Sequence, residues 1–239
     1  MSTEELYLMN PYLRKCEATV LKVEKVKGKR AYLTLDKTIF HPLAGGQPSD
    51  EGIVVGGNGV FEVRKAVKVE GEVKLLGFFK VGQLAPGDHV TCELDWSKRY
   101  KVMRLHTAGH ILDYAMMKFY GRLVETLEAF HGPPEAYLVY DVESEPEKSE
   151  LERIVSEIVS SSLPVFVRNV PASELQKTIY NAPNLSRLPL REIYRVVEIS
   201  SVNAMPCTGT HVANTSEVGS FSIKSVKMVK GCRIAYDVE

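Results

Sequence analysis

The chain has 239 residues, of which 44% are hydrophobic and 25% are charged, and its formal net charge at pH 7 is zero. This composition is typical of a soluble globular protein with one large or two medium domains, and it argues against a protein coated uniformly in positive charge. No stretch is apolar for long enough to cross a bilayer, and the N-terminus has acids and a proline where a signal peptide has a basic and then an apolar run. We expect a cytoplasmic protein without a membrane partner.

The segment from Cys16 to about Asp95 predicts β-structure. Its apolar residues alternate with polar ones or form short runs, and glycine, proline and asparagine separate these runs. Short strands with frequent turns favour a small β-barrel. The first clear helical periodicity begins at about Ser97, so we predict a barrel domain at 1–96 and a second domain at 97–239.

The second domain mixes helices and strands. A helix over 97–120 would carry an apolar stripe, with Arg104, Asp113 and Lys118 mostly on other faces; the stripe comprises Leu105, Ile111, Leu112, Ala115, Met116 and Phe119. A second amphipathic helix at 146–163 has Ser149 as its expected N-cap and Glu152 at the capping-box position. The other predicted elements are strands at 136–144, 162–171 and 193–207, a short helix at 171–180 and a hairpin at 219–239. The fold class is therefore α+β with an antiparallel sheet.

Two pairs of residues have the spacing of metal ligands: His106 with His110, and Cys207 with His211. Residues four apart lie on one face of a helix, so His106 and His110 can present two imidazole nitrogens to one ion. A thiolate with two or three imidazoles is typical of tetrahedral zinc. Either pair alone is more often a set of core or solvated side chains, but four of the ten Cys and His residues fall in these pairs. We predict one shared Zn²⁺ site per chain.

The remaining cysteines and the basic clusters are less informative. Cys16, Cys92 and Cys232 have no C-x-x-C partner, and we expect buried thiols in strands. Three basic clusters could bind a polyanion through one face or form the solvated sides of strands; they lie at 22–30, 98–104 and 224–233.

Three motifs together resemble one family. They are H-T-A-G-H at 106–110, C-T-G-T-H-V at 207–212 with the T-S-E-V-G-S-F-S-I run that follows, and F-H-P-L-A-G-G-Q-P-S-D-E-G at 40–52. This set resembles the editing region of alanyl-tRNA synthetases and the free-standing alanyl-tRNA editing proteins of the AlaX family. Their order and spacing match the longer free-standing form, in which a small β-barrel with the glycine motif precedes the metal-binding editing domain.

The chain departs from the family pattern at two points. Ala44 stands where the family usually has the first of three glycines, and Cys232 precedes Arg233 where family members often have two adjacent arginines. Neither position belongs to the expected ligand set.

The resemblance implies hydrolysis of the ester that links a wrong amino acid to the terminal adenosine of tRNA(Ala). With no room for an aminoacylation domain and its ATP site, we expect an ATP-independent hydrolase that acts in trans on Ser-tRNA(Ala), with Gly-tRNA(Ala) as a second candidate substrate. Two alternatives stay open: a deacylase for another mischarged tRNA such as Ser-tRNA(Thr), and a zinc-stabilised tRNA-binding module without hydrolysis. The absence of Glu between His106 and His110 argues against a thermolysin-like peptidase. The sequence predicts no oligomeric state.

The resemblance also implies the roles of individual residues. The four metal ligands His106, His110, Cys207 and His211 would be the catalytic residues. Because they would fill a tetrahedral shell, either one ligand is loose, the ion becomes five-coordinate, or zinc orients groups while a separate water attacks.

Serine differs from alanine by one hydroxyl, and a buried partner for this hydroxyl would be left unpaired by alanine. Thr126 is the first candidate for that partner by alignment, with Thr107 and Thr210 as alternatives. Four residues of the glycine motif would contact a ribose or phosphate: Gly45, Gly46, Gln47 and Asp50. Their turn offers backbone N–H groups and allows a ligand to approach closely. The alternative is that they form only a tight barrel turn.

Overall fold

The computed structural model describes residues 3–239 and consists of two compact units that meet between Tyr100 and Lys101. This division falls inside the long helix α2 (Trp96–Tyr120). The sequence predicts the domain boundary at 96/97, where the helix begins.

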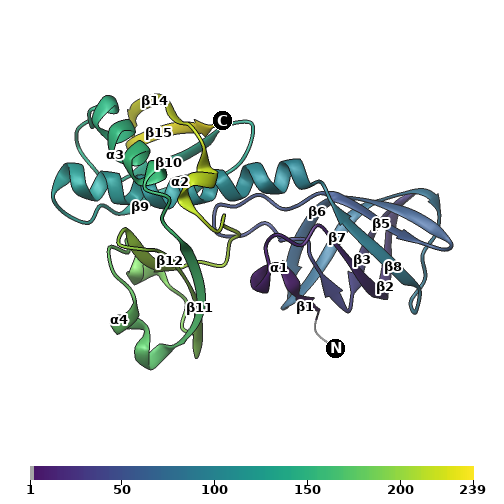
Figure 1. Cartoon of the computed structure of the whole chain (residues 1–239). Coiled ribbons are helices and arrows are strands. Elements are labelled where there is room, and N and C mark those ends of the chain that lie inside the picture. The colour runs from purple at the N-terminus through teal and green to yellow at the C-terminus, as the bar shows by residue number, and fades with distance from the viewer. Residues whose placement is uncertain (1–2) are drawn as a thin grey trace. The chain divides into compact units, whose positions relative to one another are not determined.

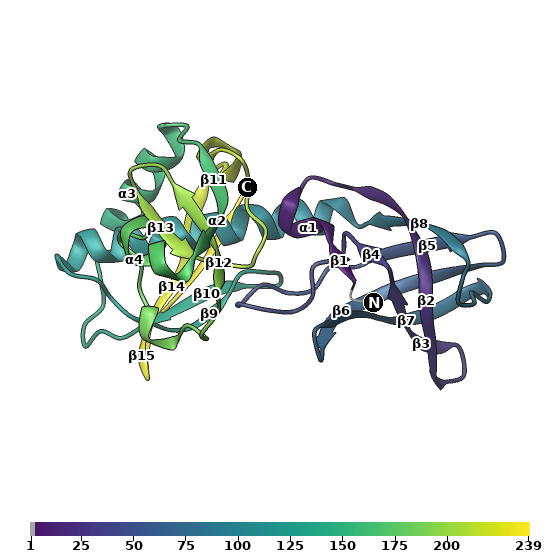
Figure 2. The same ribbon diagram turned by 90° about the horizontal axis from the view of Figure 1, so that it is seen from below.

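The first unit contains a closed barrel, which confirms the predicted β-barrel (Figures 1 and 2). Its six strands pair antiparallel all the way round. In barrel order they are β2 (Lys15–Lys27), β3 (Arg30–Leu35), β7 (Glu72–Gly82), β6 (Gly59–Val69), β5 (Gly52–Gly56) and β8 (His89–Leu94). Alternation directs side chains such as Leu33, Phe61 and Leu75 into a dry core, where each is at most 1% exposed.

Short elements complete this unit. The strand β1 (Glu4–Glu5) pairs parallel with β4 (Lys37–Thr38), and the single-turn helix α1 (Leu6–Met9) follows β1. The glycine motif occupies the connection between β4 and β5.

The second unit has two antiparallel sheets, as the α+β fold class predicts. The larger sheet has the order β14 (Phe221–Val229), β15 (Gly231–Val238), β10 (Ala136–Tyr140), β9 (Thr126–Phe130). The smaller sheet has the order β11 (Val165–Pro171), β12 (Ile193–Ile199), β13 (Asn203–Pro206). The helices besides α2 are α3 (Lys148–Ser160) and α4 (Leu175–Thr178), with 3₁₀ turns η1 (Ala172–Glu174), η2 (Leu185–Arg187) and η3 (Thr215–Val218).

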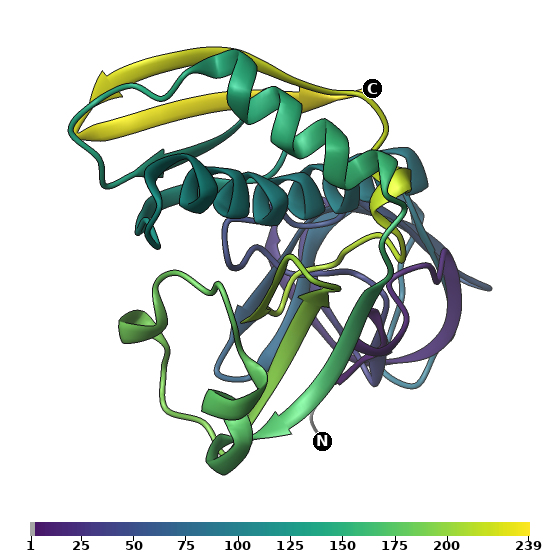
Figure 3. The same cartoon turned by 60° about the vertical axis from the view of Figure 1, so that its left-hand side comes forward.

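In this second unit, α2 runs between the two sheets (Figure 3). Its apolar stripe is buried as predicted except for Phe119, which is 37% exposed near the end of the helix. The Tyr236 hydroxyl on β15 donates to the Leu105 carbonyl at 3.1 Å, and the Asn203 amide on β13 donates to the His110 carbonyl at 2.7 Å. Both sheets are therefore tied to the same stretch of α2. Across residues 3–239, no helix has the length and apolar character that a bilayer crossing requires.

Two local predictions are wrong. Ser149 does not cap α3, which begins at Lys148 without a side-chain cap, and Glu152 instead accepts a hydrogen bond from the Ile223 N–H on β14 at 2.8 Å. The stretch 193–207 is not one strand but the β12–β13 hairpin, because the chain reverses at Ser201 with a φ of +64°.

The three cysteines outside the metal motif all lie in strands. Cys92 and Cys232 are buried, Cys16 is half-buried, and all three are free thiols.

Candidate metal centre and substrate site

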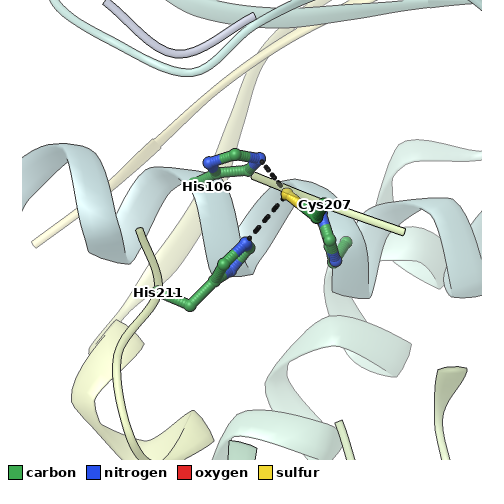
Figure 4. Close-up of side chains that lie close together, drawn as sticks. His106, Cys207 and His211 are labelled. Atoms are coloured by element: carbon green, nitrogen blue, oxygen red, sulfur yellow. Dashed lines mark hydrogen bonds between the residues drawn. The ribbon is translucent and has the colours of Figure 1, made fainter. Parts of the chain in front are cut away.

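The fold brings both predicted ligand pairs together in the second unit. One potential ligand atom from each of His106, His110, Cys207 and His211 lies within 4.8 Å of all the others. The Cys207 sulfur is 3.6 Å from His106 Nε2 and 3.4 Å from His211 Nε2 (Figure 4). The cluster can hold a metal ion, since its sulfur and nitrogen donors converge on one point.

The histidine pair is presented by α2. The His106 and His110 rings lie edge to face, with centroids 5.2 Å apart, as expected for side chains one helical turn apart. Asn203, fully buried at the start of β13, donates to the carbonyl of His110. This bond fixes the β12–β13 hairpin against the turn of α2 that carries the ligands.

The second pair follows β13 directly, and Arg195 on β12 shapes that loop. Its Nη1 donates to the carbonyls of Cys207 at 2.7 Å and Gly209 at 2.9 Å. The Gly209 N–H in turn points at the Cys207 sulfur, 3.4 Å away. Burial raises the pKa of the Cys207 thiol, whereas the Gly209 N–H and the charge of Arg195 lower it. A bound cation would supply the further stabilisation that a thiolate needs here.

Thr107 sets the orientation of His211. Its hydroxyl donates to the Met103 carbonyl at 3.0 Å and accepts the Val212 N–H at 3.3 Å. Nδ1 of His211 lies 3.1 Å from the same oxygen. Since the only hydroxyl proton is used, we assign the imidazole proton of His211 to Nδ1, which leaves the Nε2 lone pair facing the cluster. The Thr107 hydroxyl thus contacts the ligand His211, and its contact with a serine hydroxyl stays a prediction.

A second observation, at His110, also supports a metal ion at this cluster. Nδ1 of His110 is buried and has no hydrogen-bond partner among residues 3–239. Burial lowers the pKa of His110 to about 4, so the ring is a neutral imidazole at pH 7. A buried ring nitrogen without a hydrogen-bond partner is costly, and a bound metal ion fixes the ring and its tautomer.

Sequence reasoning missed His131, which follows β9. Its ring stacks on that of His106, with centroids 4.3 Å apart and planes 14° apart. Its Nδ1 lies 2.8 Å from the hydroxyl of Tyr236, which in turn donates to the Leu105 carbonyl. Burial lowers the pKa of His131 to about 3. A neutral fourth histidine therefore borders the ligand cluster.

Gly109 explains how His131 can lie so close to α2. A Cβ at this position would be 2.6 Å from His131 Cε1, 2.7 Å from His131 Nδ1 and 2.8 Å from the Tyr236 hydroxyl. Glycine inside a helix costs about 1 kcal/mol relative to alanine. The glycine of H-T-A-G-H was thus a sequence signal for a close neighbour, although it did not name the neighbour.

The three threonines proposed to contact serine lie in different surroundings. Thr126 begins β9, is 7% exposed, and donates its hydroxyl proton to Asp113 Oδ1 at 3.1 Å. Thr210 is fully buried between the ligands Cys207 and His211. Asp113 lies on α2 three residues after His110, and the sequence did not single it out for the site. Burial raises its pKa to about 7, against hydrogen bonds from Tyr140 and Thr126 that lower it.

The glycine motif belongs to the first unit. Gly45 and Gly46 have φ of +58° and +75°, and the residues on either side, Ala44 and Gln47, exchange both backbone hydrogen bonds, at 3.2 and 2.9 Å. This is a two-residue turn in which glycine is favoured at both central positions. Gln47 is fully buried and Gly45 is exposed.

Asp50 has a structural set of contacts. Its carboxylate forms a two-oxygen ion pair with Arg99, which is 1% exposed, and accepts the His41 N–H at 2.5 Å. These contacts secure the end of the glycine motif to the start of α2 and occupy both carboxylate oxygens.

Two protein-family models match the chain. Residues 7–98 match the model described as tRNA synthetases class II (A), and residues 194–234 match the threonyl and alanyl tRNA synthetase second additional domain. The second match includes Cys207 and His211.

The relatives cover nearly the whole chain. The alanyl-tRNA editing protein AlaX-M of Methanosarcina barkeri is 32% identical over 95% of this chain and 93% of its own length. The corresponding protein of Methanosarcina mazei is 33% identical over 94% and 91%. The chain belongs to the family of alanyl-tRNA editing proteins.

Longer relatives share the same region. The alanyl-tRNA editing protein AlaX-L of Pyrococcus horikoshii is 32% identical, and this chain spans 57% of its length. An alanine–tRNA ligase of Staphylothermus marinus is 33% identical, and the chain spans 25% of it. The family thus occurs both as shorter proteins and as part of longer ones, and all share the two units described above at the level of sequence.

Proposed function

We propose that this chain is a zinc-dependent aminoacyl-tRNA deacylase that hydrolyses Ser-tRNA(Ala) in trans, with Gly-tRNA(Ala) as a second substrate. The observation that carries the proposal is the convergence of His106, His110, Cys207 and His211 in a member of the alanyl-tRNA editing family. Charged tRNA as the substrate places the activity in the cytoplasm, and no ATP is consumed because ester hydrolysis is downhill.

Zinc suits this donor set better than the other common biological cations. One sulfur and three imidazoles favour zinc over magnesium or calcium, which prefer oxygen ligands. Zinc, when bound, supplies a Lewis acid that can polarise the ester carbonyl or acidify a water.

The chain's own residues orient this centre. Thr107 holds the tautomer of His211, Arg195 holds the loop of Cys207 by its carbonyls, and Asn203 holds the helical turn of His110. Such outer contacts typically change metal affinity or activity by about 10- to 100-fold when removed. His131 adds a neutral ring over His106 and limits water on that side of the cluster.

A second hydrolytic site is useful because a pocket shaped for alanine rejects other small amino acids weakly. Glycine is smaller than alanine and fits, and one added hydroxyl is worth only about 1–3 kcal/mol. An editing site instead needs a group that pairs with the serine hydroxyl and is left unpaired by alanine. Thr126 is our candidate for that group, because its hydroxyl bonds to Asp113, which lies one helical turn beyond His110.

The first unit would contribute to tRNA binding. The exposed turn at Gly45 and Gly46 presents backbone without side chains, which allows a ribose or phosphate to approach closely. Gln47 and Asp50 support this turn from inside, Asp50 through its ion pair with Arg99.

A panel of charged tRNAs tests the proposal. The purified chain is incubated with Ser-tRNA(Ala), Gly-tRNA(Ala), Ala-tRNA(Ala) and Ser-tRNA(Thr), each with a labelled amino acid, and release is followed against the spontaneous rate. We expect rapid release of serine from Ser-tRNA(Ala) and retention of alanine. Release of serine from Ser-tRNA(Thr) alone would show that the substrate is charged tRNA(Thr) and not charged tRNA(Ala). Retention of every amino acid by a chain with bound zinc would favour a tRNA-binding module.

A further inference from the structure

A part-buried polar network lies one helical turn beyond the metal ligand His110. Asp113 shares the face of α2 that carries His106 and His110, since the three residues are spaced by four and then three. Its Oδ1 accepts two hydrogen bonds, from the Thr126 hydroxyl at 3.1 Å and from the Tyr140 hydroxyl at 2.9 Å. The network joins α2 to the first residue of β9 and the last residue of β10.

The network fixes the direction of the Thr126 hydroxyl. A threonine hydroxyl has one proton and two lone pairs. Oδ1 of Asp113 already receives two hydroxyls, so a proton on this carboxyl group belongs on Oδ2, and Oδ1 is an acceptor in either protonation state. Because Thr126 gives its proton to Asp113, its oxygen can offer only lone pairs to a third group. Thr126 is therefore an acceptor toward any ligand, and a ligand must donate to it.

The backbone of Thr126 is held as firmly as its side chain. Its N–H donates to Asn184 Oδ1 at 3.1 Å, and its carbonyl accepts from Arg187 Nη1 at 2.9 Å. Thr126 also pairs with Tyr140 across the β9–β10 ladder. The threonine oxygen is thus preorganised, so its alignment costs little when a ligand binds.

The strand β9 flanks the ligand cluster along α2. At its start, Thr126 contacts Asp113; just after its end, His131 stacks on His106. The two contacts lie on either side of His110 along the helix, so the strand spans the stretch of α2 that presents the histidines. The hydroxyl of Thr126 therefore lies beside the turn of α2 that follows His110.

We propose that Asp113 is a positioning residue for serine recognition: it takes the proton of Thr126 and so makes Thr126 the acceptor of the hydrogen bond from the substrate's serine hydroxyl. This inference rests on the proposed function. Serine satisfies the acceptor and alanine has no donor to offer it, so the polarity of one hydroxyl separates the two substrates. Asp113 itself does not touch the substrate.

A double-mutant cycle on the full chain tests this role. Thr126→Val removes the acceptor, and Asp113→Leu removes the group that directs it. Each single variant should lower kcat/KM for Ser-tRNA(Ala) by about tenfold, the value of one lost hydrogen bond. The double variant should fall no further than either single variant, because Asp113 acts through Thr126. Asp113→Asn keeps an amide oxygen for Thr126 and should stay within about threefold of the wild type.

Three controls separate positioning from damage to the fold. Asp141→Leu makes the matched change at an exposed aspartate near the same network and should leave kcat/KM unchanged. Thr126→Ser keeps the hydroxyl and should retain serine release. Zinc content and thermal unfolding are measured for every variant, and Asp113→Ala replaces Asp113→Leu if the leucine variant does not fold.

The outcomes distinguish this inference from the function on which it rests. Losses that multiply to about a hundredfold in the double variant, or an Asp113→Leu variant as active as the wild type, would overturn the role of Asp113 and leave the deacylase intact. A wild-type chain that spares Ser-tRNA(Ala) would overturn both.

Discussion

Each unit of this chain contains an aspartate whose side chain is hydrogen-bonded near a candidate functional segment, and the two carboxylates have partners of different kinds. Asp50, in the glycine motif, pairs with the guanidinium of Arg99 and a backbone N–H. Asp113, near the ligand cluster, pairs with the neutral hydroxyls of Thr126 and Tyr140, and burial raises its pKa to about 7. The charge of Asp50 is compensated by that of Arg99, and this ion pair holds the end of the glycine motif against α2. Partial compensation at Asp113 leaves a group whose environment costs free energy.

Such a cost is typical of functional sites. Strongly shifted pKa values cluster at functional sites, where burial and a specific geometry are kept although they lower the stability of the fold. In the second unit, Asp113 lies near three other unusual features: a His110 nitrogen without a hydrogen-bond partner among residues 3–239, a half-buried thiol at Cys207, and a glycine that admits a fourth histidine. The contrast predicts that substitutions at Asp50 change stability, whereas those around the cluster change metal binding and hydrolysis.

The largest effect is expected at Asp50. Asp50→Ala leaves the buried guanidinium of Arg99 without its counter-charge, and we expect a loss of about 3–5 kcal/mol in the free energy of unfolding. Urea denaturation measures this loss, with Asp141→Ala at an exposed aspartate as the control. A loss below about 1 kcal/mol would mean that the ion pair does not hold this segment.

Removal of the only sulfur ligand should abolish the metal centre. We expect Cys207→Ala to lose stoichiometric zinc and to lower serine release by at least about 100-fold, more than the loss of an outer contact. His106→Ala should behave in the same way. Cys16→Ala, which changes a half-buried thiol in the barrel, is the matched control for zinc content and activity. A Cys207→Ala variant that keeps both would break the shared-site account.

Gly109→Ala should be destabilising although alanine is the better helix former. The new Cβ would overlap His131 and Tyr236, and overpacking of this kind costs about 1–3 kcal/mol. Urea denaturation and zinc affinity both report the change. Gly57→Ala, where an added Cβ meets nothing within 4 Å, is the control. A more stable Gly109→Ala protein would show that His131 can move aside freely.

A smaller effect is expected in the pH dependence of stability. An unfolded aspartate loses its proton near 3.8, whereas folded Asp113 keeps it up to about 7. Between these values the folded state binds more protons, so a rise in pH lowers the free energy of unfolding, by at most about 1.4 kcal/mol per pH unit. The stabilising contribution is present below the lower value and is lost as the pH passes the higher one. Asp113→Asn should flatten this slope relative to wild type at equal zinc, and parallel slopes would contradict the shift.

The smallest effect is expected at Ala44, the family departure in the glycine motif. Ala44 precedes the two glycines with positive φ, and its backbone already closes the turn with Gln47. Ala44→Gly should change the free energy of unfolding by less than about 1 kcal/mol. A larger change in serine release than in stability would show that this position contacts the substrate.

Local patterns explain what the sequence could predict. The barrel follows from alternation within each strand, and the pairing of His106 with His110 follows from the geometry of one helix turn. The convergence of this pair with Cys207 and His211 was inferred from composition and resemblance, because nothing local joins residues a hundred positions apart.

The parts that the sequence did not predict depend on distant contacts. His131 and Asp113 gain their places only when β9 packs along α2, and neither has a periodic or motif signal of its own. Ser149 and Glu152 have the letters of a capping box, but Glu152 is used by the backbone of Ile223, far away in the chain. The β12–β13 hairpin was read as one strand because Ser201 carries an unfavourable φ that no glycine or asparagine signals at that position.

The most direct test of the account is a zinc titration of the metal-free chain, with serine release from Ser-tRNA(Ala) measured at each point. For a zinc-dependent deacylase we expect no release without zinc, a rise in proportion to bound zinc, and a plateau at one ion per chain. Full release from the metal-free chain, or no release at one bound zinc per chain, would contradict it.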